Sequence, residues 1–510
     1  MNLYALSTLI AITVTALYAH SLYSSSWISQ SPGQEGGGGG SGGAATATGA
    51  HGRSGRKDWD ILYHLGGNGP WIRKVDGIVT ADIGPPEGCE VDQVHMMSRH
   101  GERFPTTSAG ARMLDLLKRI RESSVQLKGD LEFVNDWEYF TQDPSKHLEQ
   151  LVTVGPYAGT LEAFTTGVKL RTRYAHLLPA NSDEPKAAPV RLWASDSNRV
   201  IDTARYFRAG FFGLDDGHEA RKASSLQVIP ETADLGADTL TPGDTCLKYR
   251  NDIERGHDYG AAMLAKFRAT YLGAIGARLQ KQNPQMEKRF EDGEIYSMQE
   301  MCGFETLARG SSPWCDVFTH DDWENFEYAR DVIHYYRAGP GNRYGPAMGW
   351  LWLNATANLL SAGPSSTAPL FFSFVHDGDI IPMLAALDIF ASKDKHHLPV
   401  THVPKERTWR TSQVTPMGGR VIFERLTCRP SSSSSSASTS SEQTGKSSFI
   451  RININDGIVA LPDCSSGPGH SCPLPEFLEI IRERGKEVGD FREVCGLGKD
   501  APDRISFLHQ

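Results

Sequence analysis

The chain has 510 residues, of which 39% are apolar, and its 61 acidic and 52 basic side chains give a formal net charge of −9. This length is ample for a large buried core and favours about two to four domains. The mildly acidic balance argues against a nucleic-acid-binding protein, which would carry a basic surplus. It does not exclude a small anionic substrate, because a pocket can be locally basic.

The first 30 residues are predicted to be a targeting segment. Residues 3–19 form an apolar run that resembles the hydrophobic part of a secretory signal peptide. No lysine or arginine precedes this run, so an uncleaved signal anchor remains an alternative. Residues 31–57 are rich in glycine, serine and alanine and are expected to form a disordered tether. One folded domain is expected over residues 58–510.

Three segments of this domain share one pattern, in which a short apolar strand is followed by a polar cluster and then by a helix. Strands are expected at residues 91–97, 190–194 and 370–375, and the clusters are residues 98–105, 195–199 and 376–379. The alternation predicts an α/β fold with a mainly parallel sheet flanked by helices. Ligands of such sheets bind beyond the carboxyl ends of the strands, where all three clusters would lie.

Helical patterns interrupt the alternation. Aromatic and aliphatic residues recur at helical spacing over residues 323–336, and residues 347–361 are another strong helix candidate. They predict a mostly helical subdomain inserted at about residues 104–188 and 215–365. A serine-rich tract at residues 430–448 lies between two strand-like stretches and is predicted to be a surface loop.

The cysteine pattern indicates an oxidising compartment. The eight cysteines are an even set without a CxxC pair, which argues against zinc binding and thioredoxin-type redox chemistry and favours disulfides. Asn354 begins the single glycosylation sequon, which would be modified if exposed, although its apolar surroundings are equally compatible with a packed helix. His396, His397 and His402 lie close in sequence, but no carboxylate or cysteine has a persuasive ligand spacing, so no metal site is predicted.

The first polar cluster carries the clearest chemistry. Arg99 and Arg103 surround His100, and guanidinium groups match phosphate oxygens in geometry and charge. A neutral imidazole between them can attack phosphorus, because the arginines neutralise the oxyanions that would repel it. The pattern RHGxRxP would arise by chance in such a chain only about 10⁻⁴ times, so this signal is strong.

The other two clusters add groups that complete a phosphate site. Arg199 supplies a third guanidinium, His376 a further donor and Asp377 a proton source for a leaving alkoxide. Taken alone, Arg199 is more typical of a surface salt bridge, and the His376-Asp377 pair could simply cap a helix. The arginines should keep His100 unprotonated but also favour ionised Asp377, so bound phosphate must offset their charge. The constellation requires no metal or other cofactor.

Residues 99–106, RHGERFPT, together with His376-Asp377, resemble the signature of the histidine acid phosphatases. This family, a branch of the phosphoglycerate-mutase-like superfamily, includes fungal phytases and secreted acid phosphatases. Residues 63–71, 86–90 and 195–200 support the resemblance, which covers about Trp59 to the C-terminus. The resemblance implies a phosphoglycerate-mutase-like fold and a transiently phosphorylated His100. It also implies that Arg99, Arg103, Arg199 and His376 bind the phosphate and that Asp377 protonates the leaving group.

The resemblance further implies a disulfide pairing, which spacing alone cannot choose. The implied pairs are Cys89–Cys428, Cys246–Cys495, Cys302–Cys315 and Cys464–Cys472. Gly378 follows the His-Asp pair, where the phytases of the family usually have asparagine, and this difference weakens the case for phytate preference without affecting the phosphatase assignment.

We therefore expect a secreted or surface-tethered acid phosphomonoesterase that acts on small phosphate esters through a phosphohistidine. A phytase is the alternative within the family. A non-catalytic surface protein that binds phosphorylated ligands would be expected to lack His100 or Asp377, and both are present. No nucleic-acid partner is expected, and membrane association is expected only if the N-terminal segment is retained.

Overall fold

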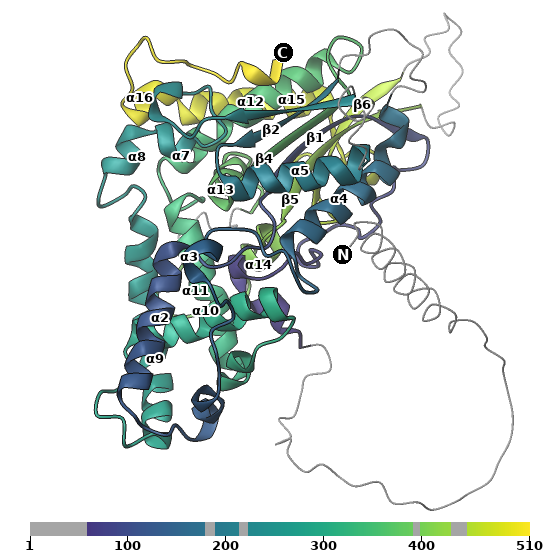
Figure 1. The fold of residues 1–510 in the computed structure, drawn as a ribbon. Helices are drawn as coiled ribbons and strands as arrows, with labels where there is room; N and C mark the ends of the chain where they lie inside the picture. Colours follow the sequence, from purple (N-terminus) through teal and green to yellow (C-terminus); the bar gives the residue numbers. More distant parts are fainter. Residues whose placement is uncertain (1–58, 179–188, 214–222, 391–397, 430–445, 510) are drawn as a thin grey trace, which may run out of the picture. The chain divides into compact units, whose positions relative to one another are not determined.

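The computed structural model describes residues 59–178, 189–213, 223–390, 398–429 and 446–509 (Figure 1). The predicted targeting segment and tether, His396, His397 and most of the serine-rich loop lie outside the described residues. The chain divides into two units, Met1–Trp59 and Asp60–Gln510, and the description below concerns the second.

A single mixed sheet forms the centre of this unit, with the strand order β3-β2-β4-β1-β5-β6-β7 and with β8 paired to β6. The strands are β1 (Cys89–Arg99), β2 (Val190–Ser195), β3 (Ser224–Ile229), β4 (Leu370–Val375), β5 (Arg420–Cys428), β6 (Ser447–Ile454), β7 (Gly457–Val459) and β8 (Cys472–Pro473). The first four strands in this order are parallel, whereas the pairings from β1–β5 onward are antiparallel. The parallel arrangement that the sequence predicts is therefore present in one half of the sheet. This half carries the three polar clusters.

The antiparallel half of the sheet alters one expected boundary. β6 begins at Ser447, inside the range expected for the serine-rich loop, because Ser447 and Ser448 continue the antiparallel ladder opposite Cys428 and Thr427. The hydrogen bonds of an antiparallel ladder, rather than side-chain hydrophobicity, hold these two serines in the strand.

Helices cover both faces of the sheet (Figure 1). On one face α5 (Asn198–Phe212) packs on β2, β3 and β4, and α4 (Gly159–Tyr174) packs on α5. Phe207 and Phe211 of α5 contact Phe372 of β4 within a buried apolar cluster. On the other face Trp352 of α12 (Gly345–Ala362) donates a hydrogen bond to Ser373 of β4, at 3.3 Å. Strands buried on both faces explain why β4 is apolar almost throughout.

The remaining helices complete the second layer and form a helical part beyond one end of the sheet (Figure 1). In the sheet layer are α13 (Asp377–Ala386), α15 (Leu474–Val488) and α16 (Phe491–Cys495). The helical part contains α2 (Thr107–Glu122), α9 (Tyr259–Gln282), α10 (Asp292–Arg309) and α11 (His320–Arg337), which pack on one another. Short helices α3 (Pro144–His147), α7 (Pro242–Thr245), α8 (Leu247–Asn251) and α14 (Thr411–Val414) connect these elements.

Two helices inside the ranges expected for the helical insertions belong instead to the sheet layers. These are α4 and α12, which pack mainly on α5 and on α13 and α15. Asn354 lies in the middle of α12 and is half-buried, and Thr356 of its sequon is fully buried. The apolar run around the sequon is therefore the core-facing surface of a helix.

The structure contains four disulfides, two of which link distant parts of the chain. They are Cys89–Cys428, Cys246–Cys495, Cys302–Cys315 and Cys464–Cys472, the pairing that the family resemblance implied. The first joins the start of β1 to the end of β5, where the two residues are opposite each other in the ladder. Within the described part of the chain, no helix combines the length and the apolar character needed to cross a bilayer.

Candidate active site

The three predicted polar clusters line one cavity of about 650 Å³ at the carboxyl ends of β1, β2 and β4. β4 lies between the other two strands, and Arg99 at the end of β1 is level with Val375 at the end of β4. All six residues expected to act on phosphate, Arg99, His100, Arg103, Arg199, His376 and Asp377, line this cavity. The parallel half-sheet therefore brings together residues that are up to 278 positions apart, from Arg99 to Asp377.

His100 is held rigidly at the end of β1. Its backbone N–H donates to Val375 at 3.0 Å, and its carbonyl accepts from Gly418 at 2.8 Å. The ring Nδ1 is 2.9 Å from the carbonyl oxygen of Gly101, and because a carbonyl can only accept, Nδ1 carries the proton. Nε2 is then the nitrogen with the free lone pair in the neutral ring. The structure gives the imidazole the tautomer that a nucleophile needs.

Gly101 lets this strand end approach a neighbouring helix. A Cβ atom at Gly101 would lie 2.8 Å from the carbonyl oxygen of Gly159, the first residue of α4. A Cβ at Gly159 would in turn lie 2.2 Å from the carbonyl oxygen of Glu102. Only glycine fits at both positions, so the backbone that carries His100 is packed directly against α4.

Arg99 connects the catalytic strand to the proposed proton donor. Its Nη1 donates to the carbonyl oxygens of Gly67 and Thr415, each at 2.7 Å, and its Nη2 lies 3.0 Å from Oδ2 of Asp377. The Arg99 side chain is only 1% exposed, so the guanidinium is fixed and desolvated. Asp377 is the first residue of α13, and its carboxylate lies beside the carboxyl end of β1, where it pairs with Arg99.

Arg103 and Arg199 complete the ring of charge around His100. Arg103 donates to the carbonyl oxygen of Phe104 at 2.8 Å, and Arg199 pairs with Glu149 at 3.0 Å. Within the described residues, the buried Nε atoms of Arg99, Arg103 and Arg199 have no hydrogen-bond partner.

The charges around His100 and Asp377 shift both of their pKa values downward. Burial, followed by the charges of Arg99 and Arg103, holds the pKa of His100 well below its ordinary value. Burial acts to raise the pKa of Asp377, but the charge of Arg99, with His334 and Arg337, outweighs it and holds this pKa well below the ordinary range. In the free protein His100 is therefore neutral, as expected, and Asp377 is ionised.

Several basic residues of the cavity lie outside the three clusters and were not identified from the sequence. Arg112 of α2, Arg250 of α8 and both Arg330 and Arg337 of α11 line the same cavity. The sequence does not show which basic residues of these helices face inward. The periodicity of α11 is a signal for its buried face, but it does not show that Arg330 on this face is aimed at a cavity.

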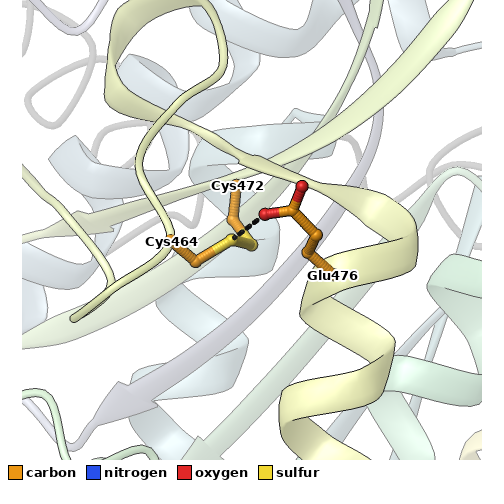
Figure 2. Close-up of side chains that lie close together, drawn as sticks. All are labelled: Cys464, Cys472 and Glu476. Atoms are coloured by element: carbon orange, nitrogen blue, oxygen red, sulfur yellow. Dashed lines mark hydrogen bonds between the residues drawn. A yellow bond between two sulfur atoms is a disulfide. The ribbon is translucent and has the colours of Figure 1, made fainter.

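A cluster with the composition of a metal site lies outside this cavity. Figure 2 shows Cys464, Cys472 and Glu476 close together, with Oε2 of Glu476 3.4 Å from Sγ of Cys464. The two sulfur atoms are bonded to each other, so neither is available as a thiolate ligand. His402 is exposed, with Nδ1 3.1 Å from the hydroxyl of the adjacent Thr401.

The cavity is suited to in-line attack on a phosphoryl group. An unprotonated imidazole nitrogen, three guanidinium groups and a carboxyl group line the same cavity, and they are candidates for the roles of nucleophile, oxyanion ligand and, once protonated, proton donor. These groups are fixed by backbone hydrogen bonds and burial before any ligand is bound, so little reorganisation is needed.

Comparisons with known proteins agree with this arrangement. The model of the histidine phosphatase superfamily (branch 2) matches residues 90–455, a stretch that contains all six of these residues. The chain is similar to the phytase PHO112 of Candida albicans, with 33% identity over 454 residues that cover 88% of this chain and 90% of the relative. It is also similar to the constitutive acid phosphatase of Saccharomyces cerevisiae, with 31% identity over 448 residues that cover 86% and 87%.

The fold has counterparts among solved structures. The phytase from D. castellii superposes with a TM-score of 0.76 and 29% sequence identity, and the match covers 88% of this chain and 90% of that chain. The multiple inositol polyphosphate phosphatase of Bifidobacterium longum matches with a TM-score of 0.56 and 15% identity, covering 87% and 100%, which is a likeness of fold alone.

Proposed function

The chain belongs to branch 2 of the histidine phosphatase superfamily, and from this premise we propose that it is an acid phosphatase that hydrolyses phosphate monoesters through a phosphohistidine at His100. The observation that carries the assignment to His100 is the bond between its Nδ1 and the carbonyl of Gly101. This bond leaves Nε2 unprotonated in a cavity ringed by buried arginines.

In the first step, Nε2 of His100 attacks the phosphorus atom and the bond from phosphorus to the ester oxygen breaks. Asp377 gives its proton to the departing oxygen, so that an alcohol leaves rather than an alkoxide. Arg99, Arg103 and Arg199 bind the phosphoryl oxygens, whose negative charge they neutralise during attack.

In the second step, water attacks the phosphohistidine. Asp377, now a carboxylate, accepts the proton of this water as the bond from phosphorus to Nε2 breaks, which releases inorganic phosphate and restores both groups. Because Arg99 keeps Asp377 ionised in the free protein, the proton for the first step must arrive with the substrate. A phosphate monoester has a second pKa of about 6, so its monoanion, abundant in acid, is the form that delivers this proton.

The proposed enzyme is exported through the secretory pathway and is either released or held at the cell surface. Four disulfides support this location, because such bonds persist in oxidising compartments. Its proposed substrates are small phosphate esters, and phosphate release is expected to be unaffected by EDTA and blocked by vanadate or tungstate.

The experiment that tests the function is hydrolysis of an aryl phosphate at acidic pH by the secreted protein and by its His100→Ala variant. The wild type should release phosphate, and the variant should lose turnover while keeping the thermal unfolding temperature of the wild type. Turnover by a folded His100→Ala variant would refute the nucleophile assignment.

A second candidate function is that of a phytase, and the additional arginines of the cavity favour it. Arg112, Arg250, Arg330 and Arg337 lie around the three arginines of the phosphate site, although Glu300 pairs with Arg112 at 3.0 Å. A substrate that carries several phosphates would engage these outer cations, whereas a simple ester would not reach them. The relative in Candida albicans is named a phytase.

The Arg250→Ala variant separates the two candidates, because Arg250 is exposed and its guanidinium donates only to the backbone oxygen of Asp244 among the described residues. For a phytase, this change should lower kcat/KM for phytate about tenfold and leave kcat/KM for an aryl phosphate nearly unchanged. Arg255→Ala is the matched control, since Arg255 lies outside the lining of this cavity. Equal losses for both substrates would argue against the phytase candidate.

A further inference from the structure

One carboxyl group of the catalytic motif takes no part in the proposed mechanism. Glu102 lies between His100 and Arg103, but it is not among the residues that line the catalytic cavity and it is only 1% exposed. Its Oε1 accepts the backbone N–H of Trp71 at 2.9 Å. Its Oε2 is buried and has no hydrogen-bond partner within the described residues. Glu102 therefore has one satisfied and one unsatisfied oxygen in the interior of the protein.

The charges around Glu102 do not offer it a counterion. Glu162 of α4 is a like charge that faces it, and Arg420 of β5 already pairs with Glu162 at 3.0 Å. Arg420 also lies 3.9 Å from Asp456, between β6 and β7. Arg99 on β1 is paired within the catalytic cavity. No described cation forms an ion pair with Glu102, so its ionised form would be a buried charge without a counterion.

The protonated form of Glu102 is therefore the stable one in acid. Burial and the charge of Glu162 raise the pKa of Glu102 to about 8, against the opposing effects of the Trp71 N–H and the charge of Arg420. A neutral carboxyl group costs much less to bury than a carboxylate. In acid Glu102 is compatible with the packed interior, whereas at alkaline pH it is not.

The backbone of Glu102 is joined to the group that fixes His100. Its nitrogen shares a peptide bond with the carbonyl of Gly101, which accepts from Nδ1 of His100 at 2.9 Å. The carbonyl oxygen of Glu102 accepts from Val152 at 2.9 Å, and a Cβ atom at Gly159 would lie 2.6 Å from the nitrogen of Glu102. Because this peptide is packed so closely, a movement of the Glu102 side chain toward water would also displace the Gly101 carbonyl.

We propose that Glu102 is a positioning residue that acts as a neutral carboxyl group and holds the peptide that fixes the tautomer of His100, and that its ionisation releases this peptide. The inference rests on the proposed phosphatase function and adds a pH-sensitive residue to it. Trp71 is the other half of the contact, and Arg420 and Lys169 lie 4.6 and 5.2 Å from the centroid of its ring. The contact is complete in acid, and the charge on Glu102 breaks it as the pH rises through about 8.

The same group gives the stability of the folded protein a defined pH dependence. In the unfolded chain Glu102 ionises near its ordinary pKa of 4.5, whereas in the folded protein it keeps its proton up to about pH 8. Its contribution to stability is therefore greatest below pH 4.5 and is lost as the pH rises to about 8. Between these values the folding equilibrium constant should fall about tenfold per pH unit through this residue alone.

Glu102→Gln tests the proposal, because glutamine keeps the shape of the neutral carboxyl group and cannot ionise. Tungstate is a suitable probe of the catalytic cavity, since it stays a dianion from neutral to alkaline pH. Its dissociation constant for the wild type should rise about tenfold between about pH 7 and about pH 9, as the binding-competent form is lost, and should rise much less for Glu102→Gln. Urea unfolding from acid to neutral pH should show the wild type losing stability relative to this variant.

Two further variants separate this role from a general loss of structure. Glu305→Gln is the matched control, because Glu305 is also 1% exposed but its oxygens accept from Trp137 and Ser312. This control should lower the stability while keeping the wild-type pH dependence of tungstate binding. Glu102→Asp retains an ionisable group at the same place and should retain the alkaline loss of tungstate binding.

Parallel tungstate titrations of the wild type and Glu102→Gln from neutral to alkaline pH would overturn the proposal, and so would an equal change in Glu305→Gln. Should Glu102→Gln fail to fold, Glu102→Ala also lacks the carboxyl group, and a stability that keeps the pH dependence of the wild type would contradict the proposal. Failure of the proposed function has a different signature, namely turnover by the His100→Ala variant, so the two can be told apart.

Discussion

At the residue scale, the proposed reaction needs a histidine that stays unprotonated, and therefore nucleophilic, in acid. Burial and the charges of Arg99, Arg103 and Arg199 all disfavour the imidazolium form of His100, so they lower its pKa together. In the proposed mechanism the same cations bind the oxyanions of the substrate. One set of side chains thus prepares the nucleophile and attracts its target, which explains why arginine, whose charge persists at every working pH, occupies all three positions.

The acidic limb of the pH profile should therefore depend on these arginines. In Arg199→Gln one positive charge near His100 is lost, so the pKa of His100 rises and its protonation begins at a higher pH. The acidic limb of kcat/KM should move to higher pH, although burial, the largest cause of the shift, remains. The pH dependence of aryl phosphate hydrolysis measures this, and an acidic limb that stays in place would show that the charge of Arg199 does not act on His100.

Asp377 should matter most for esters with poor leaving groups. Asp377→Asn removes the proton donor, and kcat for an alkyl phosphate should fall about 10²–10⁴-fold. The loss should be much smaller for an ester of an acidic phenol, which departs without a proton. A series of esters with graded leaving-group pKa checks this, and a uniform loss across the series would contradict the role of Asp377 as general acid.

The site residues divide into those that the sequence predicts and those that it does not. His100 and its two flanking arginines lie in one contiguous motif, and Arg199 and Asp377 follow strands with clear apolar patterns. Glu231, which also lines the cavity, has no such signal, because it reaches the cavity only through the position of β3 beside β2 at the edge of the sheet. Arg330 likewise becomes a cavity residue only through the packing of α11 against the rest of the helical part.

At the scale of elements, close packing of α4 against α5 supports the strand ends. A Cβ atom at Gly210 of α5 would lie 2.0 Å from the carbonyl oxygen of Phe164 in α4. A Cβ atom at Gly167 of α4 would lie 2.2 Å from the carbonyl oxygen of Phe207 in α5. Both clashes are with backbone atoms, so the two helices would have to move apart to accept a larger residue.

Gly210→Ala should accordingly destabilise the protein by about 1–3 kcal/mol. Gly273→Ala is the matched control, because Gly273 lies on the exposed side of α9 and its added Cβ would meet nothing within 4 Å. This control should stabilise the protein by about 0.5–1 kcal/mol, since alanine favours a helix over glycine. Denaturant or thermal unfolding of both variants measures the difference, and equal stabilities would contradict the close packing of α4 on α5.

The strand–helix alternation predicted the parallel half of the sheet and the place of the site, because apolar runs and the polar clusters behind them are local signals. The antiparallel half was not predicted, since β5 and β6 pair through contacts that sequence patterns do not encode. For the same reason α4 and α12 could not be assigned to the sheet layers. Amphipathic or apolar periodicity identifies a helix, but it does not identify its partner.

At the scale of the whole molecule, the disulfides close loops of very different length. Cys89 and Cys428 are 339 residues apart, whereas Cys464 and Cys472 are only 8 apart. A crosslink restricts the unfolded chain more when its loop is long, so the first bond should contribute more to stability.

Paired serine variants test this difference. Cys89→Ser with Cys428→Ser should destabilise the protein by about 3 kcal/mol more than Cys464→Ser with Cys472→Ser, from the chain entropy of the two loops. Equilibrium unfolding under non-reducing conditions measures both values. A larger loss from the short-loop pair would mean that unfolded-chain entropy is not what these bonds contribute.

The fold as a whole places one imidazole nitrogen and one carboxyl group in a single cavity lined by buried arginines. The most direct measurement of that claim is to mix the protein rapidly with an aryl phosphate, stop the reaction in alkali, where phosphohistidine survives, and map the phosphorylated peptide. The phosphoryl group should lie on His100 and be absent from the His100→Ala variant. A phosphoryl group on any other residue, or turnover by the wild type without a trapped intermediate under single-turnover conditions, would contradict the account.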